Sequence, residues 1–165
     1  SRGVLDMDAQ VTPRAPKIKP RYNENSAIPS YFLSHGTLCV LDLKKTREFY
    51  EEFLGLEVVR HNRAAMCFRL NTDTRIVCVE VKKVPRMDVM THWWLDVPNR
   101  EDVATAHAAA VANKEKYGLQ KIPACHEQHG VYAFFIQERD NNWWENQHTP
   151  MEQTNFFSIV GICRS

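Results

Sequence analysis

The sequence lacks an excess of charge of either sign, because its 165 residues carry a formal net charge of +1 at pH 7. A balanced charge excludes bulk electrostatic attraction to nucleic acid or to an acidic membrane surface. No apolar run approaches the roughly 18 residues that span a bilayer, and residues 1–10 lack the apolar core of a signal peptide. We therefore expect a cytoplasmic protein whose partner is a small molecule, not nucleic acid or a membrane.

Paired cysteines are also missing, because none of the five cysteines forms a CxxC motif. Four of them lie in apolar, strand-like runs, a pattern typical of reduced, buried thiols and not of a disulfide framework. No cysteine has an obvious basic neighbour that would lower its pKa, and no Ser/His/Asp arrangement is evident. The sequence contains no glycine-rich phosphate loop. The histidines and acidic residues are left as the candidates for chemistry.

The two ends of the chain differ in composition from its middle. In residues 1–30, prolines alternate with basic residues and periodic apolar residues are absent, which indicates an extended arm. The tail, residues 149–165, holds a β-prone apolar run that would add an edge strand or reach across a dimer. An apolar tail favours a homodimer, because it needs a surface to cover.

The first half of the middle region, residues 31–84, predicts one βαβββ module. Asp42 is a suitable N-cap, apolar side chains follow it at three- and four-residue steps, and Gly55 supplies a C-terminal stop. Turn-forming residues separate the last two strands. The predicted elements are a strand at 32–41, a helix at 43–54, and strands at 56–60, 64–70 and 75–81.

The second half, residues 88–148, predicts the same order of elements. Its helix is alanine-rich, opens at Pro98-Asn99 and stops at Gly118. The chain is therefore an internal repeat of roughly 55 residues, βαβββ twice, and its fold class is α+β. The predicted elements are strands at 90–97, 120–124, 131–137 and 143–147, with the helix ending near Tyr117.

Two histidines and one glutamate occupy matching places in the repeat. His35 and His92 lie near the start of the first strand of each module, and Glu145 lies on the last strand of the second. A glutamate among aromatic residues is costly to bury without a cation or a hydrogen-bond donor. Two neutral imidazoles and one carboxylate suit Fe(II), Mn, Co, Ni or Zn. The pattern predicts a metal site, although a lone histidine in an apolar strand is more often a satisfied core residue.

The segments around these three residues carry a family resemblance. They are His35-Gly-Thr-Leu-Cys-Val-Leu-Asp42-Leu43 with Phe49-Tyr50 and Leu54-Gly55-Leu56, then His92-Trp-Trp-Leu-Asp-Val and Phe135 through Glu145. Over residues 31–147 the chain resembles the vicinal oxygen chelate superfamily, which includes glyoxalase I, the fosfomycin resistance proteins and the type I extradiol dioxygenases. The resemblance implies two βαβββ modules forming a half-open β-sheet barrel around a metal that His35, His92 and Glu145 hold.

Departures from the family pattern concern the choice among its activities. Relatives of glyoxalase I usually carry a fourth ligand, a carboxylate on the last strand of module one, and here Glu80 is the candidate. An outward-facing or salt-bridged Glu80 is the alternative, and it would leave the open triad of ring-cleaving dioxygenases. His129 resembles the histidine that those enzymes carry before their final turn. Those enzymes also carry a tyrosine that this chain lacks at the matching place, and Tyr132 would substitute for it. For His126 and His129, a position in a polar loop is the alternative.

Tryptophans flank the predicted ligands. Trp93 and Trp94 adjoin His92, Trp143 lies near Glu145, and strand alternation sends one of each tryptophan pair toward the cavity. An aromatic-lined cavity favours a planar or apolar substrate. Ordinary core packing explains the tryptophans equally well.

The resemblance implies a metal-dependent enzyme, and our leading hypothesis is an Fe(II) dioxygenase of extradiol type that acts on a catechol-like or other vicinal-oxygen substrate. The nearest alternative is a redox-neutral lyase, isomerase or epimerase that uses Zn, Ni, Co or Mn. A metal-free protein that sequesters its ligand is a further alternative, against which the retained metal-ligand residues argue. The sequence leaves open whether the two modules close on each other or swap between the subunits of a dimer.

Overall fold

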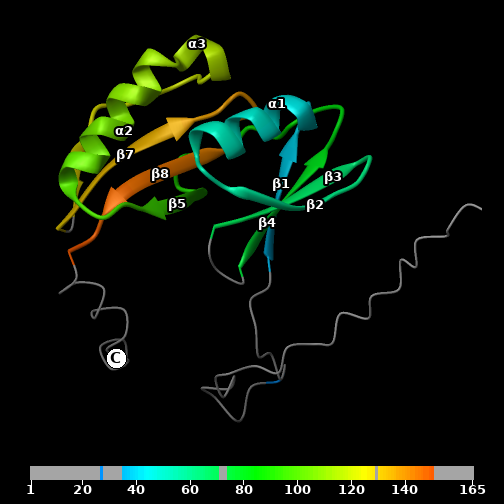
Figure 1. Ribbon diagram of the computed structural model, residues 1–165, viewed down its shortest axis with the longest axis horizontal. Helices are drawn as coiled ribbons and strands as arrows, with labels where there is room; N and C mark the ends of the chain where they lie inside the picture. Colours follow the sequence, from blue (N-terminus) through cyan, green and yellow to red (C-terminus); the bar gives the residue numbers. More distant parts are fainter. Residues whose placement is uncertain (1–26, 28–34, 71–73, 129, 151–165) are drawn as a thin grey trace, which may run out of the picture. The chain divides into compact units, whose positions relative to one another are not determined.

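The computed structural model describes residues 27, 35–70, 74–128 and 130–150. These residues form two four-stranded sheets, whose arrangement can be followed in Figure 1. The strand orders are β1-β4-β3-β2 and β5-β8-β7-β6. In each sheet the first strand pairs in parallel with the last, and the other pairs are antiparallel. The strands are β1 (His35–Val40), β2 (Glu57–His61), β3 (Ala65–Arg69), β4 (Arg75–Glu80), β5 (His92–Asp96), β6 (His126–Gln128), β7 (Val131–Gln137) and β8 (Trp143–His148).

The shared strand order confirms the α+β fold class with two βαβββ modules. Neither sheet closes into a full barrel, because each is an open, four-stranded sheet. Apart from Ala27, the predicted arm at residues 1–30 lies outside the described residues, as does the predicted tail from residue 151. No helix in the described ranges is both long enough and apolar enough to cross a membrane.

The predicted helix ends are confirmed. Asp42 precedes α1 (Leu43–Arg47), and its carboxylate accepts a hydrogen bond at 3.1 Å from the backbone N–H three residues later. Asn99 caps α2 (Arg100–Ala112) in the same way at 2.8 Å. Gly118 ends the helical region of the second module with a left-handed φ of 65°. These caps depend on residues close together in sequence, which is why the sequence predicts them.

The prediction of one regular helix from Leu43 to Leu54 is wrong. After α1 the chain widens into the π-helix η1 (Glu48–Phe53), with a hydrogen bond of 3.1 Å from Leu54 N to Phe49 O. The wider turn allows two consecutive aromatic side chains, Phe49 and Tyr50, to be buried together.

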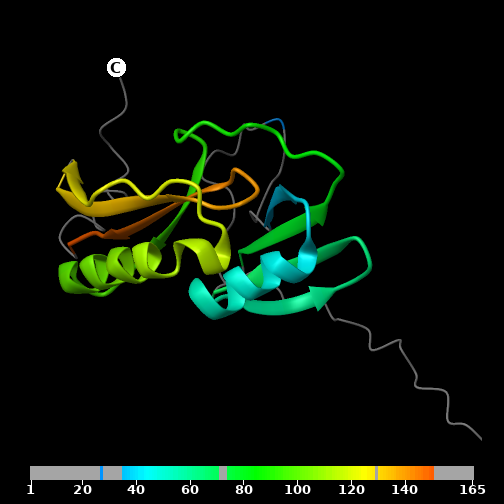
Figure 2. The same cartoon turned by 90° about the horizontal axis from the view of Figure 1, so that it is seen from above.

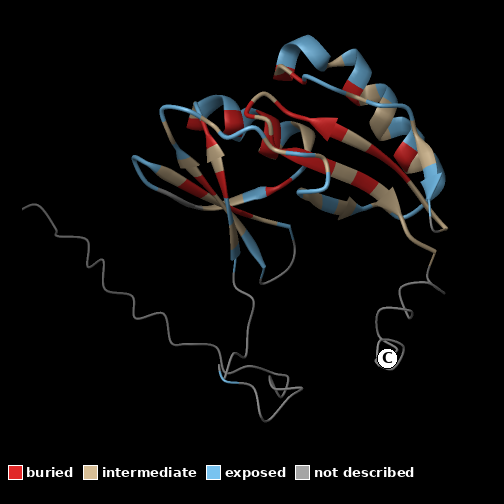
Figure 3. Ribbon diagram, turned by 180° about the vertical axis from the view of Figure 1, so that it is seen from behind, coloured by how far each residue is buried: buried red, intermediate tan, exposed pale blue. Residues whose placement is uncertain are grey.

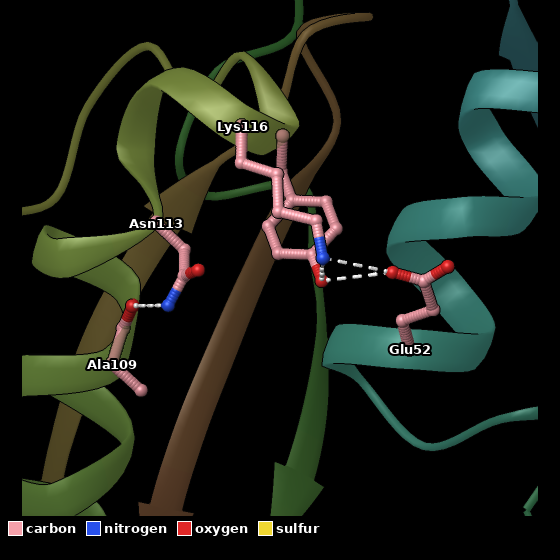
Figure 4. Close-up of polar contacts among 5 residues, drawn as sticks. Glu52, Ala109, Asn113 and Lys116 are labelled. Carbon is pink, nitrogen blue, oxygen red and sulfur yellow. Dashed lines mark hydrogen bonds and ion pairs between the residues drawn. The ribbon is translucent and has the colours of Figure 1, made fainter.

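The second helix is interrupted at Asn113, whose side-chain amide donates a hydrogen bond of 2.9 Å to Ala109 O (Figure 4). A short helix, α3 (Lys114–Tyr117), follows. Lys116 on α3 lies 3.0 Å from the Glu52 carboxylate on η1, so an ion pair joins the helices of the two modules. Both groups are exposed, and such pairs contribute little to stability.

The predicted strand at residues 120–124 is wrong. Only an isolated bridge between Lys121 and Gln137 forms there, and the strand that pairs with β7 is β6, farther along the chain. Pro123 explains the difference, because proline has no N–H to donate to a strand ladder.

The two modules share one hydrophobic core. The Tyr50 ring lies edge-on to the Trp144 ring at 5.4 Å, and the Phe49 ring lies 5.7 Å from Tyr117. Buried residues are concentrated on β7 and β8 (Figure 3). The helix α2 packs against these two strands and covers one face of the second sheet (Figure 2).

The cysteines in the described part of the chain are free thiols, as the absence of CxxC pairs predicts. Cys78 is buried in the shared core, and burial raises the pKa of its thiol well above the ordinary value. This residue is therefore a core residue and not a nucleophile.

Candidate metal centre

The open face of the second sheet carries the predicted metal ligands of the second module. His92 on β5 pairs with Trp143 on β8, and Trp94 pairs with Glu145 in the same register. Because side chains alternate along strands, these four side chains share one face of the sheet. The opposite face lies under α2, where Trp144 is fully buried. The sheet thus leaves the histidine and the glutamate on the uncovered side.

His92 and Glu145 are brought together directly. The distance from His92 Nε2 to Glu145 Oε2 is 3.0 Å, and the side chains are 21% and 16% exposed. The other ring nitrogen, Nδ1, lies 2.7 Å from the carbonyl oxygen of Val89. A carbonyl oxygen only accepts hydrogen bonds, so Nδ1 carries the proton in the neutral ring, and Nε2 then presents a lone pair to the carboxylate.

Two facing acceptors repel each other unless a cation or an added proton lies between them. Histidine ligands of metals usually donate their other N–H to a carbonyl or carboxylate, as His92 does to Val89. Adjacent nitrogen and oxygen ligands with bonds of about 2.1 Å lie about 3 Å apart in an octahedral site. The pair therefore fits two ligands of a divalent metal.

Aromatic rings surround this pair. The Phe135 ring centroid lies 5.2 Å from that of His92, and the Trp94 ring lies 6.3 Å away with 60% of the residue exposed. His126, on β6, stacks on Phe135 at 5.4 Å. The structure does not have the polar-loop position that is the alternative for His126, because the pairing of β6 with β7 places this residue on the open face.

His35 lies on β1, in the other sheet, and is exposed. Within the described ranges, no group of three histidine, cysteine or acidic side chains is close enough to hold a metal ion. One chain thus brings together His92 and Glu145 but not the third predicted ligand.

The fourth-ligand position of the first module is occupied by Val77. In the repeat, β1 and β4 pair as β5 and β8 do, so that Val77 stands where Glu145 stands in the second module. Glu80 lies on the opposite face of the first sheet, and its carboxylate accepts a hydrogen bond of 3.0 Å from Leu43 N at the start of α1. The structure therefore gives Glu80 the role of a helix cap and does not bring it to the metal pair.

Several other predicted site residues lie elsewhere. Tyr132 is on the helix-covered face of the second sheet, with the Arg100 guanidinium 4.2 Å from its ring. Trp93 packs against the shared core, whereas Trp143 is on the open face and donates a hydrogen bond of 3.2 Å from Nε1 to Met87 O. His129 lies outside the described residues. Of the three predicted cavity tryptophans, Trp94 and Trp143 share the face of the metal pair.

Trp93 instead fixes the contact between β5 and β1. A Cβ atom at Gly36 would overlap the six-membered ring of the Trp93 indole. We expect Gly36→Ala to lower the free energy of unfolding by about 1–3 kcal/mol, as overpacking does. Adding Trp93→Phe makes room, so the double variant should be more stable than the sum of the single effects predicts. Urea unfolding of all four proteins measures this, and an unchanged stability for Gly36→Ala would contradict it.

A buried carboxylate organises the turn that leads into β8. Glu138 is 2% exposed and accepts hydrogen bonds from Asp140 N at 2.9 Å, Asn142 N at 3.0 Å and Asn142 Nδ2 at 2.7 Å. Burial raises the pKa of Glu138 to about 7, and the donated hydrogen bonds oppose that rise. Asn141 completes the tight turn with a left-handed φ of 68°.

The same turn joins the two modules. Asp140 Oδ1 accepts a hydrogen bond of 3.2 Å from Leu41 N, and Asn142 Nδ2 donates one of 3.2 Å to Cys39 O. Glu145 lies three residues after Asn142 on β8, so the buried turn sets the position of Glu145 relative to the end of β1. The role of Glu138 could not be predicted from the sequence, because a glutamate beside an arginine gives no signal of burial.

The chain matches the model of the Glyoxalase/Bleomycin resistance protein/Dioxygenase superfamily over residues 32–146. The chain therefore belongs to this superfamily, the vicinal oxygen chelate superfamily, and the resemblance seen in the sequence is confirmed. Members of the superfamily are mostly enzymes, and metal-dependent chemistry is typical of them. Curated protein sequences give no match.

Solved structures share the fold at low sequence identity. Fosfomycin resistance protein FosX from Listeria monocytogenes, complexed with Mn(II) and sulfate, matches with a TM-score of 0.61 and 18% identity, over 77% of this chain and 97% of that one. A glyoxalase-related enzyme from Fulvimarina pelagi gives 0.59 and 21%, over 72% and 88%. A glyoxalase/bleomycin resistance protein from Albidiferax ferrireducens T118 gives 0.57 and 18%, over 72% and 98%. These likenesses establish the fold.

Proposed function

We propose that this protein is a metal-dependent enzyme in which His92 and Glu145 are two of the metal ligands. One observation carries the proposal: His92 Nδ1 lies at hydrogen-bond distance from Val89 O, so in the neutral imidazole the Nε2 lone pair faces a carboxylate oxygen at 3.0 Å. A divalent cation between the two acceptors removes their repulsion, and imidazole with carboxylate suits Fe(II), Mn, Co, Ni or Zn.

The third ligand in this proposal is His35 from a second copy of the chain. His35 is exposed and lies on the face of β1 opposite to the buried Leu38 and Val40. In the repeat it is the counterpart of His92. Because one chain does not bring it to the pair, a homodimer that packs the first module of each chain against the second module of the other would complete the site.

For the activity, we infer an Fe(II) dioxygenase of extradiol type that acts on a catechol-like substrate. Val77 in the fourth-ligand position supports a three-ligand set, which leaves about three positions of an octahedron open. Bound Fe(II) would supply Lewis-acid and redox chemistry to a substrate that chelates it through adjacent oxygens.

The chain's own side chains would orient such a substrate. Trp94 and Phe135 flank the metal pair and offer flat surfaces to an aromatic ring. The His126 imidazole, stacked on Phe135, lies on the same face and offers a ring nitrogen as proton donor or acceptor to a bound substrate. It joins His129 as a candidate for the proton-handling residue.

A redox-neutral lyase, isomerase or epimerase that uses Mn, Zn, Ni or Co is the second candidate. The observation in its favour is the shared fold with FosX, a fosfomycin resistance protein whose structure holds Mn(II). A three-ligand site serves such chemistry equally well.

Metal content per chain tests the proposal on protein purified without chelator or histidine tag. We expect about one metal ion per chain in the wild type and its loss in Glu145→Ala, because a two-ligand remnant binds weakly. Glu127→Ala, which removes an exposed glutamate from β6, is the control that should keep the metal. Iron together with oxygen uptake on addition of catechols supports the dioxygenase, and another metal without oxygen uptake supports the second candidate. No metal after anaerobic reconstitution would contradict both and favour a ligand-sequestering protein.

A further inference from the structure

A cavity of about 290 Å³ lies beside the metal pair, beneath the linker between β4 and β5. Two contacts connect it to the metal centre. Trp143 Nε1 donates to Met87 O at 3.2 Å, and His92 Nδ1 donates to Val89 O at 2.7 Å. The linker that covers the cavity is therefore the one that holds the ligand histidine. The cavity is lined by Arg86, Met87, Asp88, Val89, Lys121, Pro123, Gln137 and Trp143.

A buried polar side chain in this cavity has unused hydrogen-bonding capacity. Gln137 is 5% exposed and lines the cavity, where its side-chain amide has no hydrogen-bond partner from the described part of the chain and is reached by solvent, since it is not among the fully buried polar atoms without a partner. A polar group of a bound ligand would satisfy this amide.

The charge around the cavity is positive. Lys121 Nζ lies 5.8 Å from the centre of the Trp143 ring, and neither Lys121 nor Arg86 forms an ion pair within the described ranges. The single acidic residue of the lining, Asp88, already accepts a hydrogen bond of 2.9 Å from Met90 N. Two cations, an amide donor and an indole surface together suit a planar group that ends in an anion.

We propose that this cavity binds the carboxylate of an aromatic substrate whose adjacent oxygens chelate the metal, an inference that rests on the function proposed above. His92, Trp143 and Gln137 lie side by side on β5, β8 and β7. Neighbouring strands are about 4.8 Å apart, so the two strand spacings from His92 to Gln137 amount to about 10 Å, a distance that a metal-bound ring carrying a carboxylate can span. Lys121 and Arg86 neutralise the carboxylate, and Gln137 donates a hydrogen bond to it.

Benzoate is the first probe, because it carries the carboxylate and cannot chelate through two hydroxyls. We expect calorimetric titration to detect benzoate binding to both metal-free and Mn(II)-loaded protein. Lys121→Met, which keeps the side-chain stem and removes the charge, should weaken binding about tenfold. Lys114→Met, an exposed lysine on α3, is the matched control and should change nothing. Equal affinities for wild type and Lys121→Met, or no binding at millimolar benzoate, would overturn the inference.

A second pair of probes separates this inference from the proposed function. Mn(II)-loaded wild type should bind 3,4-dihydroxybenzoate about tenfold more tightly than catechol, and Lys121→Met should remove that preference while binding catechol normally. Catechol binding without any preference for the carboxylate overturns the subsite and leaves the metal site standing. Benzoate binding without catechol binding contradicts the proposed function instead.

Discussion

Co-expression of two variants that each lack metal, His35→Ala and Glu145→Ala, is expected to restore metal to about a quarter of the wild-type sites, if the chains dimerise at random. In a mixed dimer, one chain keeps His35 and the other keeps His92 with Glu145, so one of the two shared sites is complete. Half of the dimers are mixed and half of the sites in each mixed dimer are complete, so about a quarter of all sites can hold metal. Metal analysis of the co-purified protein measures the result, and native mass spectrometry counts the mixed dimers.

The matched control is co-expression of His92→Ala with Glu145→Ala. His92 and Glu145 are 3.0 Å apart within one chain, so neither variant can repair the other in a dimer. This combination should hold no more metal than either variant alone. The shared site would be contradicted if mixed dimers of the first combination form and remain without metal. Full metal content in His35→Ala alone would remove His35 from the ligand set.

The module plan could be predicted because its signals are local. Asp42, Asn99 and Gly118 act on backbone groups within four residues of themselves, and the structure has the predicted caps at all three. The pairing of His92 with Glu145 also follows from the repeat, since equivalent strands bring equivalent positions to one face.

Strand register lies beyond what the sequence predicts at single-residue accuracy. From the sequence, Glu80 is the candidate for the fourth ligand on the last strand of the first module. The observed pairing instead places Val77 in the fourth-ligand position, on the opposite face of β4 from Glu80. A shift of one residue moves a side chain to the opposite face of a strand. Glu80, expected on the face of the metal site, therefore lies on the other face and caps a helix. The burial of Glu138 could not be predicted from the sequence either, since it depends on packing between modules that are distant in sequence.

Glu138 is expected to make the folded protein less stable as the pH rises from about 4.5 to about 7. Its pKa in the folded protein is raised to about 7 from an ordinary value of 4.5, chiefly by burial. Between these values the folded state holds a proton that the unfolded state has released, so stability falls with rising pH. The free energy of unfolding lost in this way is about 3 kcal/mol in total. None of it is lost below pH 4.5, and all of it is lost above pH 7.

Glu138→Gln isolates this contribution because glutamine does not titrate. The variant loses part of the hydrogen bonding, since its amide NH2 replaces one carboxylate oxygen facing the donors Asp140 N and Asn142 N. Its stability should therefore be lower at acidic pH, whereas its slope between pH 4.5 and 7 should be flatter than that of the wild type. Urea unfolding of metal-free protein across this range measures the slopes.

The control for this comparison is Glu127→Gln, which replaces an exposed glutamate paired with Arg100 and should leave the wild-type slope unchanged. Parallel curves for wild type and Glu138→Gln would mean that Glu138 stays ionised throughout, because the three hydrogen bonds that its carboxylate accepts stabilise the charged form. A flatter curve would mean that the turn between β7 and β8 carries a proton at mildly acidic pH. Because this turn contacts the end of β1 through Leu41 and Cys39, its protonation would then couple pH to the contact between the two modules.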